Sequence, residues 1–252
     1  MKSFNFFRDK YFSTWHERLF FLLGVLMLVS EIWKQLTLTF YIGGGQYNWW
    51  YFPFQLCSIP MYVLLAYPWL QKRSVRQTLL VFLMCYTLLG GIAVFADTSG
   101  LHYPYFPLTV HSYLWHILLI GIGLLAGWVF FRGFVRPGKP EVHTGSGSRR
   151  KAQRKPFPLL THMLRPFAGS TGLYLACCLI AEFLNLSLDH LGTINMFYIN
   201  PDYQMQQVIF HDISLITGNI PGILIYIAAT MTGAFLLAAL WSEIYRILLH
   251  NT

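Results

Sequence analysis

Two side chains of nucleophile and base type lie at matching positions in two apolar stretches of the sequence. Cys57 follows the start of one stretch, Trp50–Leu70, by seven residues, and His116 follows the start of another, Thr109–Phe131, by the same number. If both stretches are helices that enter a membrane from the same face, the thiol and the imidazole lie roughly 10 Å below it, at about 1.5 Å per residue. A thiol beside an imidazole is the pairing of a cysteine nucleophile with its general base.

The residues around Cys57 favour a local break in a helix. Pro53 and Pro60 lack a backbone N–H and tend to kink helices, which can open a crevice in the helix wall. Gln55 and Ser58 add polar groups beside the thiol. A buried cysteine can equally act as a small apolar side chain. That second interpretation is the one we favour for the remaining cysteines, which lie in apolar runs without CxxC spacing: Cys85, Cys177 and Cys178.

The two histidines of Thr109–Phe131 are expected to point in different directions. His111 and His116 are five residues apart, which is about 140° around a helix. This spacing argues against a metal or haem held by both, and we expect no metal and no cofactor. His116 is the preferred general base, facing the bundle, with His111 at the helix mouth as the alternate.

Charged side chains within the apolar runs are the next candidates for function. Each costs at least about 2.5 kcal/mol in the middle of a bilayer, so such residues usually face a partner or a cavity. Glu31 and Lys34 are three residues apart and can form an ion pair within one helix. Alternatively, Glu31 orients the imidazole of His116, as a carboxylate does in hydrolytic triads. Glu182, with Asn185 beyond it, adds polar groups from another helix, so we expect a polar layer in the outer half of the membrane.

The elements that must position these residues are apolar runs of membrane-spanning length, since a spanning helix needs about 20 apolar residues. The chain has six such runs: Leu19–Tyr41, Trp50–Leu70, Gln77–Phe95, Thr109–Phe131, Thr171–Leu186 and Ile220–Ile247. A short re-entrant or interfacial helix around Gln204–Ile216 would make a seventh element. The prediction is an all-α, polytopic membrane helical bundle of six, possibly seven, transmembrane helices.

Charge supports this membrane interpretation and predicts the orientation. Only 11% of the 252 residues are charged, against about 25% in soluble domains. The net charge of +8 is concentrated in alternate connections, at the N-terminus, at 71–76 and at 132–155. This is the positive-inside pattern, so both termini are expected to be cytoplasmic. We therefore interpret the basic residues as a topology signal and not as a nucleic-acid site. The whole chain, 1–252, is expected to form one membrane domain with a flexible basic linker at about 132–156.

Four sequence segments resemble one known family. They are Ser30–Gln35 (SEIWKQ), Phe52–Ser58 (FPFQLCS), His111–His116 (HSYLWH), and Gly192–Phe197 (GTINMF) followed by Pro201. In this order they are similar to the YwaF-like integral membrane proteins of bacteria, to which the animal acyltransferase that forms polyunsaturated ether phospholipids is related. The family usually has Asn and then an aromatic residue before Met-Phe, where this chain has Ile194 and Asn195. The resemblance implies a multi-pass protein of a bacterial cytoplasmic membrane.

The resemblance also implies a reaction, because the matching cysteine of the animal relative carries the acyl group. Our leading hypothesis is an acyltransferase or transacylase that moves a fatty acyl chain between phospholipids or lyso-lipids of the outer leaflet. Cys57 would be the nucleophile, with His116 or His111 as base and Glu31 orienting it. The expected substrate-binding residues are Gln55, Asn185, Asn195 and Glu182. The alternative is a non-enzymatic lipid-binding or lipid-translocating protein; an ion channel is a third hypothesis that we consider weaker, because the polar residues form a layer and not a path.

Overall fold

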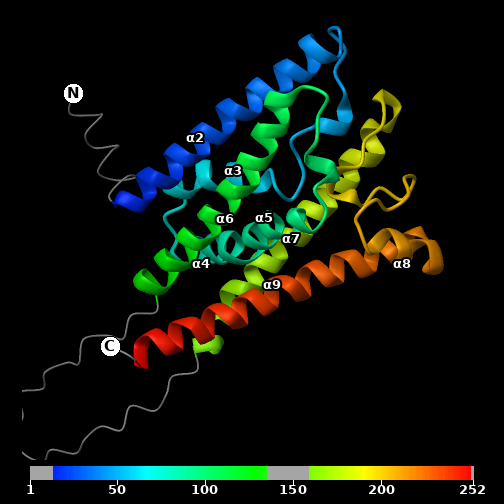
Figure 1. Ribbon diagram of the computed structural model, residues 1–252. Coiled ribbons are helices and arrows are strands. Elements are labelled where there is room, and N and C mark those ends of the chain that lie inside the picture. Colours follow the sequence, from blue (N-terminus) through cyan, green and yellow to red (C-terminus); the bar gives the residue numbers. More distant parts are fainter. Residues whose placement is uncertain (1–13, 135–158, 251–252) are drawn as a thin grey trace, which may run out of the picture.

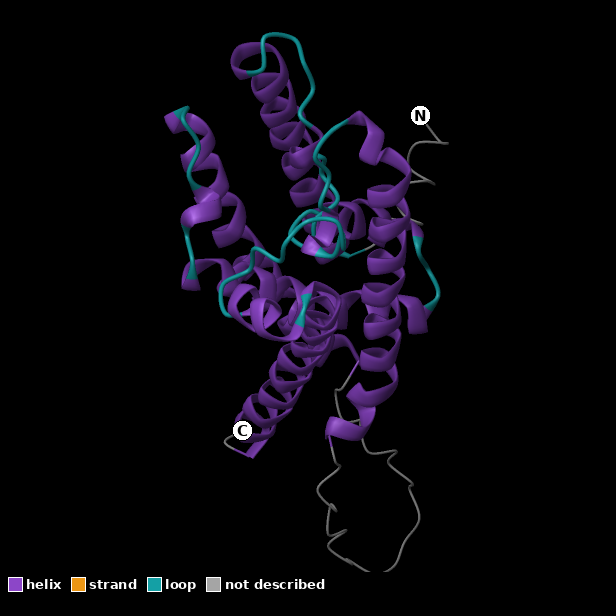
Figure 2. Cartoon of the chain, turned by 90° about the vertical axis from the view of Figure 1, so that its right-hand side faces the viewer, coloured by secondary structure: helices purple, strands orange, loops and turns teal. Residues whose placement is uncertain are grey.

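The computed structural model describes residues 14–134 and 159–250, and in these ranges the chain is helical without a strand (Figures 1 and 2). The predicted all-α fold class is therefore confirmed. Except for its first three residues, the basic linker predicted at 132–156 lies outside the described ranges.

Within the described residues, five helical runs are long and apolar enough to cross a membrane, which confirms a polytopic helical bundle. In order they are α2 (Trp15–Leu36) with the π-helix η1 (Thr37–Ile42); α4 (Arg73–Phe82), the π-helix η4 (Leu83–Thr87), α5 (Leu88–Ala93) and η5 (Val94–Ala96); α6 (Phe106–Phe134); α7 (Leu159–Leu188) with η7 (Asp189–Leu191); and α9 (Asn219–His250). A single 3-10 turn, η6 (Ser99–Leu101), lies in the connection before α6.

The second predicted span, Trp50–Leu70, is not a continuous helix, and this part of the prediction is wrong. The chain forms a 3-10 turn, η2 (Trp49–Tyr51), then runs without regular helix to Ser58. Only α3 (Ile59–Ala66) and η3 (Tyr67–Trp69) are helical. The cause is local: Phe52 precedes Pro53 and has extended backbone angles, φ −54° and ψ 131°, as a residue before proline prefers. Pro60 then stands in the first turn of α3, the place in a helix that tolerates proline.

The last third of the chain contains the short helix that the sequence suggested near 204–216. It is α8 (Phe210–Thr217), which packs on the start of α9. Before it, the chain turns back into the bundle after η7, through the 3-10 turn η8 (Met196–Tyr198). The helix α7 begins earlier than the predicted Thr171, at Leu159, and contains Pro166.

The long helices run between two ends of the bundle. Figure 1 shows the start of α2, the end of α6, the start of α7 and the end of α9 at the same end. The start of the first spanning helix and the end of the last one thus lie on the same side of the bundle, as the charge pattern predicted. The loop after η1, the segment before α6 and the connection from α7 to α9 lie at the opposite end, which we call the outer end.

Burial separates a central helix from helices that face lipid. The run Arg73–Ala96 is the most buried of the five, with 61% of its most apolar window inside the protein, against 22% for α2 and for α9. Within it, η4 is completely buried, and the Trp241 Nε1–H donates to the carbonyl of Met84 at 3.1 Å. This bond satisfies a carbonyl in the π-helical segment, where the regular i→i−4 pattern is interrupted. Large apolar side chains on α2 and α9 remain exposed, as lipid contact requires.

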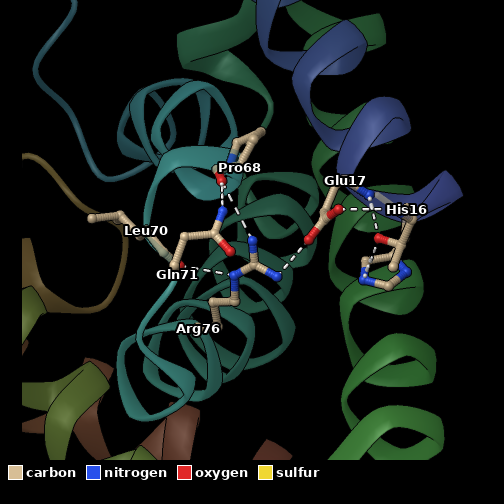
Figure 3. Close-up of polar contacts among 7 residues, drawn as sticks. His16, Glu17, Pro68, Leu70, Gln71 and Arg76 are labelled. Carbon is tan, nitrogen blue, oxygen red and sulfur yellow. Dashed lines mark hydrogen bonds and ion pairs between the residues drawn. The ribbon is translucent and has the colours of Figure 1, made fainter. Parts of the chain in front are cut away.

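An ion pair fastens the inner ends of α2 and α4 (Figure 3). Thr14 and Glu17 form a capping box that begins α2. The Glu17 carboxylate is buried and pairs with Arg76. Arg76 also donates from Nε to the carbonyl of Leu70 at 2.8 Å and lies over the ring of Tyr67. Because one guanidinium contacts α2, η3 and the turn before α4, it fixes how the short α3–η3 segment rejoins the bundle.

Candidate functional site

Cys57 lies on the unwound segment between η2 and α3, outside any helix. Its carbonyl accepts a hydrogen bond from Trp115 Nε1 of α6 at 3.0 Å. Within the segment, the N–H groups of Ser58 and Ile59 both donate to the carbonyl of Gln55, at 2.8 and 3.2 Å. The nucleophile candidate is therefore held by a tight turn and by an indole from another helix, instead of by a helical ladder.

Gln55 joins this unwound segment to the loop after α7. Its Nε2 donates to the carbonyl of Asn195 at 3.0 Å, and its Oε1 accepts from the N–H of Phe197 at 2.6 Å. The Gln55 side-chain amide thus donates one hydrogen bond and accepts another, as a peptide group of a neighbouring backbone segment would. The contact links positions about 140 residues apart in the chain.

Two buried asparagines complete the fixation of that loop. Asn185 of α7 accepts from the N–H of Met196 at 2.7 Å and donates to its carbonyl at 3.2 Å. Asn195 accepts from the N–H of Asn200 at 3.0 Å. We refer to the contacts of Gln55 and Asn185 with Asn195–Phe197 as the amide clamp. Phe197 and Tyr198 have positive φ angles of 58°, a strained backbone for residues with a side chain, so the clamp holds a shape that the chain would not adopt alone.

The clamped loop is re-entrant. The ring of Phe197 packs 5.9 Å from Phe54 and 6.1 Å from Tyr174 of α7. Tyr174 precedes the end of α7, Leu188, by fourteen residues, or about 21 Å along the helix. The Phe197 ring thus reaches inward, while the loop backbone is bonded to Asn185, three residues before the end of α7. Non-helical backbone within a membrane protein is tolerated only where other parts of the protein bury it and satisfy its polar groups, and the amide clamp does this here.

A charged group on α2 lies next to the unwound segment. Glu31 is 3% exposed and pairs with Lys34 at 2.9 Å. Gln35 bridges the two segments, because its Nε2 donates to Glu31 Oε1 and to the carbonyl of Tyr51, both at 2.7 Å. Both charges lie within electrostatic range of the Cys57 thiol. The predicted intrahelical ion pair is therefore present, and Gln35 connects it to the unwound segment.

The histidines occupy different settings on α6. The His111 ring lies between Trp33 of α2 and Trp115, 5.6 Å from each, and its Nε2 is buried without a hydrogen-bond partner. His116 is buried, and its Nδ1 contacts the carbonyl of Ser112 at 2.8 Å. Lys34 lies within electrostatic range of both imidazoles. Neither imidazole has a hydrogen bond to Cys57 or to Glu31 among the contacts of the described chain.

The other predicted binding residues have structural partners. Gln55 and Asn185 use their amides on the re-entrant loop. Glu182 lies beside Asn185, with Oε2 3.4 Å from its Nδ2, and makes no contact with the Cys57 segment. Asn195 retains a buried Nδ2 without a partner, so it is the one amide of this predicted set whose nitrogen makes no hydrogen bond.

Sequence reasoning missed two residues that the structure brings near the site. Trp115 supplies the bond to Cys57, and Tyr103 lies in electrostatic range of Cys57 and Glu31. Burial raises the pKa of the Tyr103 phenol, with Tyr51, Cys57 and Glu31 adding to the effect. Tyr103 therefore remains a neutral hydrogen-bond donor at physiological pH. Its place in the aromatic outer connection was visible in the sequence, but its approach to Cys57 was not.

Metal chemistry has no support from the described residues, which contain no group of three or more His, Cys, Asp or Glu side chains placed to hold an ion. Comparison with known proteins adds no assignment: no family model, curated protein or solved structure matches the chain. The inference of function therefore depends on the geometry of the site and on the resemblance of its sequence segments.

Proposed function

We propose that this protein is a membrane acyltransferase that moves a fatty acyl chain between phospholipids through a thioester on Cys57. The observation that carries the proposal is the position of Cys57. Its segment is unwound, held by Trp115 and Gln55, and lies in electrostatic range of Lys34. A thiolate is the reactive form of cysteine, and a buried thiolate needs a nearby cation or base.

In the first step, the Cys57 thiol gives its proton to an imidazole and the sulfur attacks the ester carbonyl carbon of a donor phospholipid. The C–S bond forms, the ester C–O bond breaks, and the departing lyso-lipid alkoxide takes up the proton. In the second step, the hydroxyl of an acceptor lyso-lipid attacks the thioester carbonyl, the imidazole takes the hydroxyl proton, and the sulfur leaves as a thiol after reprotonation. The reaction is redox-neutral and needs no cofactor.

The contacts favour His111 as the base, with His116 as the alternate. The free, buried Nε2 of His111 can accept a proton, and the ring lies 5.6 Å from the same Trp115 that binds Cys57. The Nδ1 of His116 contacts a carbonyl of its own helix. Glu31, which pairs with Lys34, would fix the position of the ammonium beside the sulfur. We place the protein in a bacterial cytoplasmic membrane, with lipid entering from the outer leaflet.

The test is covalent capture of the acyl chain. Purified protein in nanodiscs is incubated with a phospholipid that carries an alkyne-tagged acyl chain, and labelling is measured before and after hydroxylamine treatment. We expect hydroxylamine-sensitive label on Cys57, retained in Cys85→Ala and lost in Cys57→Ala. Lys34→Met and His111→Gln should slow labelling, whereas an unchanged label in Cys57→Ala refutes the proposed nucleophile.

A second candidate is lipid translocation without chemistry. Its specific support is that two non-helical segments, around Cys57 and around Phe197, meet inside the bundle through the amide clamp. Broken elements that meet near the membrane midplane are typical of transporters. Vesicles with a fluorescent phospholipid distinguish the two: a translocator should keep its transport rate in Cys57→Ser, whereas the acyltransferase should lose acyl transfer in that variant.

A further inference from the structure

An open surface cavity of about 310 Å³ lies at the outer end of the bundle, between two loops. One wall is the segment Gln46–Trp49, which connects the end of η1 to the Cys57 segment. The facing wall contains Gly192 and Thr193, directly before the re-entrant loop.

The lining of this cavity is polar and aromatic but carries no charged side chain. Gln46 and Asn48 offer amide groups, Thr193 a hydroxyl, and Tyr47 and Trp49 aromatic rings with one donor each. Asn48 uses its Oδ1 on the N–H of Trp50 at 3.0 Å, which leaves its two N–H donors for a ligand. Burial, followed by the nearby Glu31 charge and Tyr62, raises the pKa of Tyr47 to about 12, so its phenol is a neutral donor throughout the physiological range.

Trp49 is held as a flat surface in this cavity. Its ring stacks on Phe52 with a centroid distance of 5.9 Å and an interplanar angle of 21°, and the edge of Tyr47 meets it at 5.1 Å. Across the cavity, Gly192 has a φ of +145°, and a Cβ built there would come within 3.9 Å of the Trp49 ring. Gly192 therefore places only backbone beside this edge of the indole, where a Cβ would make an ordinary van der Waals contact.

We propose that this cavity binds an uncharged, hydroxyl-rich ring, namely a hexose. The C–H face of a sugar ring is apolar and packs on an indole, while its hydroxyls pair with amide, hydroxyl and phenol groups of the kind found here. The volume lies at the lower end of the range for small-molecule sites, about 300–1,000 Å³, which suits a single sugar. A phosphate would find no compensating cation in the lining.

The hexose can come from two sources, the head group of a glycolipid or a free sugar. The position favours the glycolipid, because Trp and Tyr side chains of membrane proteins collect at the headgroup level. The inference does not depend on the acyl-transfer proposal, since none of the residues that line the cavity takes part in that reaction.

The experiment measures sugar binding to the full-length protein in phosphatidylcholine nanodiscs, prepared without sugar-based detergents because these would compete. Three probes are titrated: diacylglycerols carrying a glucosyl or galactosyl head group, the corresponding free methyl glycosides, and phosphatidylglycerol as an anionic head group of similar size. Binding is followed by native mass spectrometry and by the thermal unfolding midpoint. We expect saturable binding of a glycosyl lipid, weaker binding of the free glycoside, and none of phosphatidylglycerol above the phosphatidylcholine background.

Two variants locate the binding. Trp49→Ala should weaken it at least about tenfold, as loss of an aromatic anchor does. Thr193→Val keeps the side-chain shape, lacks the hydroxyl, and should weaken it by about three- to tenfold, the value of one hydrogen bond. Thr98→Val, on another outer loop, is the matched control and should change nothing. If Trp49→Ala does not fold, the sugar binding of Thr193→Val alone tests whether the cavity is the binding site.

Equal binding of the free glycoside and the glycolipid would assign the site to a free sugar. The proposal is overturned if neither form of either sugar binds, if both variants bind as well as the natural chain, or if phosphatidylglycerol binds as tightly as the glycolipid.

Discussion

The amide clamp gives the sharpest prediction about this fold. Replacing Gln55 with Leu keeps the approximate size of the side chain but removes one donor and one acceptor. The carbonyl of Asn195 loses its bond at 3.0 Å, and the N–H of Phe197 loses its bond at 2.6 Å. Phe197 is 1% exposed, so water does not replace the lost partner without opening of the loop.

The size of the effect follows from these two bonds. A buried backbone group that loses its partner costs about 1–3 kcal/mol, and because the segment can relax we expect about 2–4 kcal/mol for the pair. At tenfold per about 1.4 kcal/mol, local opening of the loop becomes roughly 30- to 700-fold more frequent. Asn185 still holds Met196 on the other side, so the change should be local and the helices should remain folded.

Hydrogen exchange followed by mass spectrometry in nanodiscs measures this opening directly. The peptide that contains residues 194–200 should exchange faster in Gln55→Leu by the factor above, while peptides from α4 and α6 remain protected. Asn185→Leu should give a comparable increase, centred on the N–H of Met196. Gln77→Leu on α4 is the matched control and should leave the loop unchanged. An increase of less than about threefold at 194–200 in Gln55→Leu would refute the view that the clamp holds the re-entrant loop.

Three further predictions concern the helices around the site. Gly127→Ala should lower the stability by about 1–3 kcal/mol, seen as a lower thermal midpoint, because a Cβ there would lie 2.5 Å from the Trp241 ring. Gly121→Ala, where nothing lies within 4 Å of a Cβ, should be neutral or stabilising, and equal effects of the two substitutions would contradict this packing. Trp241→Phe should cost about 1 kcal/mol and increase exchange in the π-helical segment that it bonds; unchanged exchange would argue against that bond. Glu17→Gln should destabilise the inner end by about 3–5 kcal/mol, since it leaves Arg76 without its charge partner. Adding Arg76→Leu should restore part of the lost stability. A double variant less stable than Glu17→Gln would contradict this explanation.

The position of most spanning helices could be predicted from the sequence for a physical reason. In lipid every backbone polar group must be satisfied within the protein, so a long apolar run that lies in the membrane becomes a helix. This argument succeeds for α2, α6 and α9, whose apolar runs are uninterrupted. It fails for Trp50–Leu70, where composition is equally apolar but Pro53 and Pro60 remove donors. The sequence indicated a kink there, and the structure shows a full break.

The difference between a kink and a break depends on partners that lie far away in the chain. The unwound carbonyl of Cys57 is stable in the interior because Trp115 donates to it, and the loop beyond Gln55 is stable because that amide reaches Asn195. A single sequence does not show which polar side chain will meet which backbone group across a bundle. The same reason explains why the sequence did not show which residues contact the Cys57 segment.

The polar side chains of the outer half therefore divide into two classes with different physical roles. An unwound backbone in a membrane protein needs amide groups that replace the missing helical bonds, and Gln55 and Asn185 serve this need completely. Amide groups that are already hydrogen-bonded to the backbone are poor candidates for binding substrate. Gln55 and Asn185, which the sequence suggested for that role, are therefore better explained as structural support for the loop. Polar groups that retain free capacity are then the better candidates for chemistry. By this criterion the free Nε2 of His111 is the better candidate for the proposed reaction, and the same backbone break that demanded the clamp is what releases the thiol from a helix.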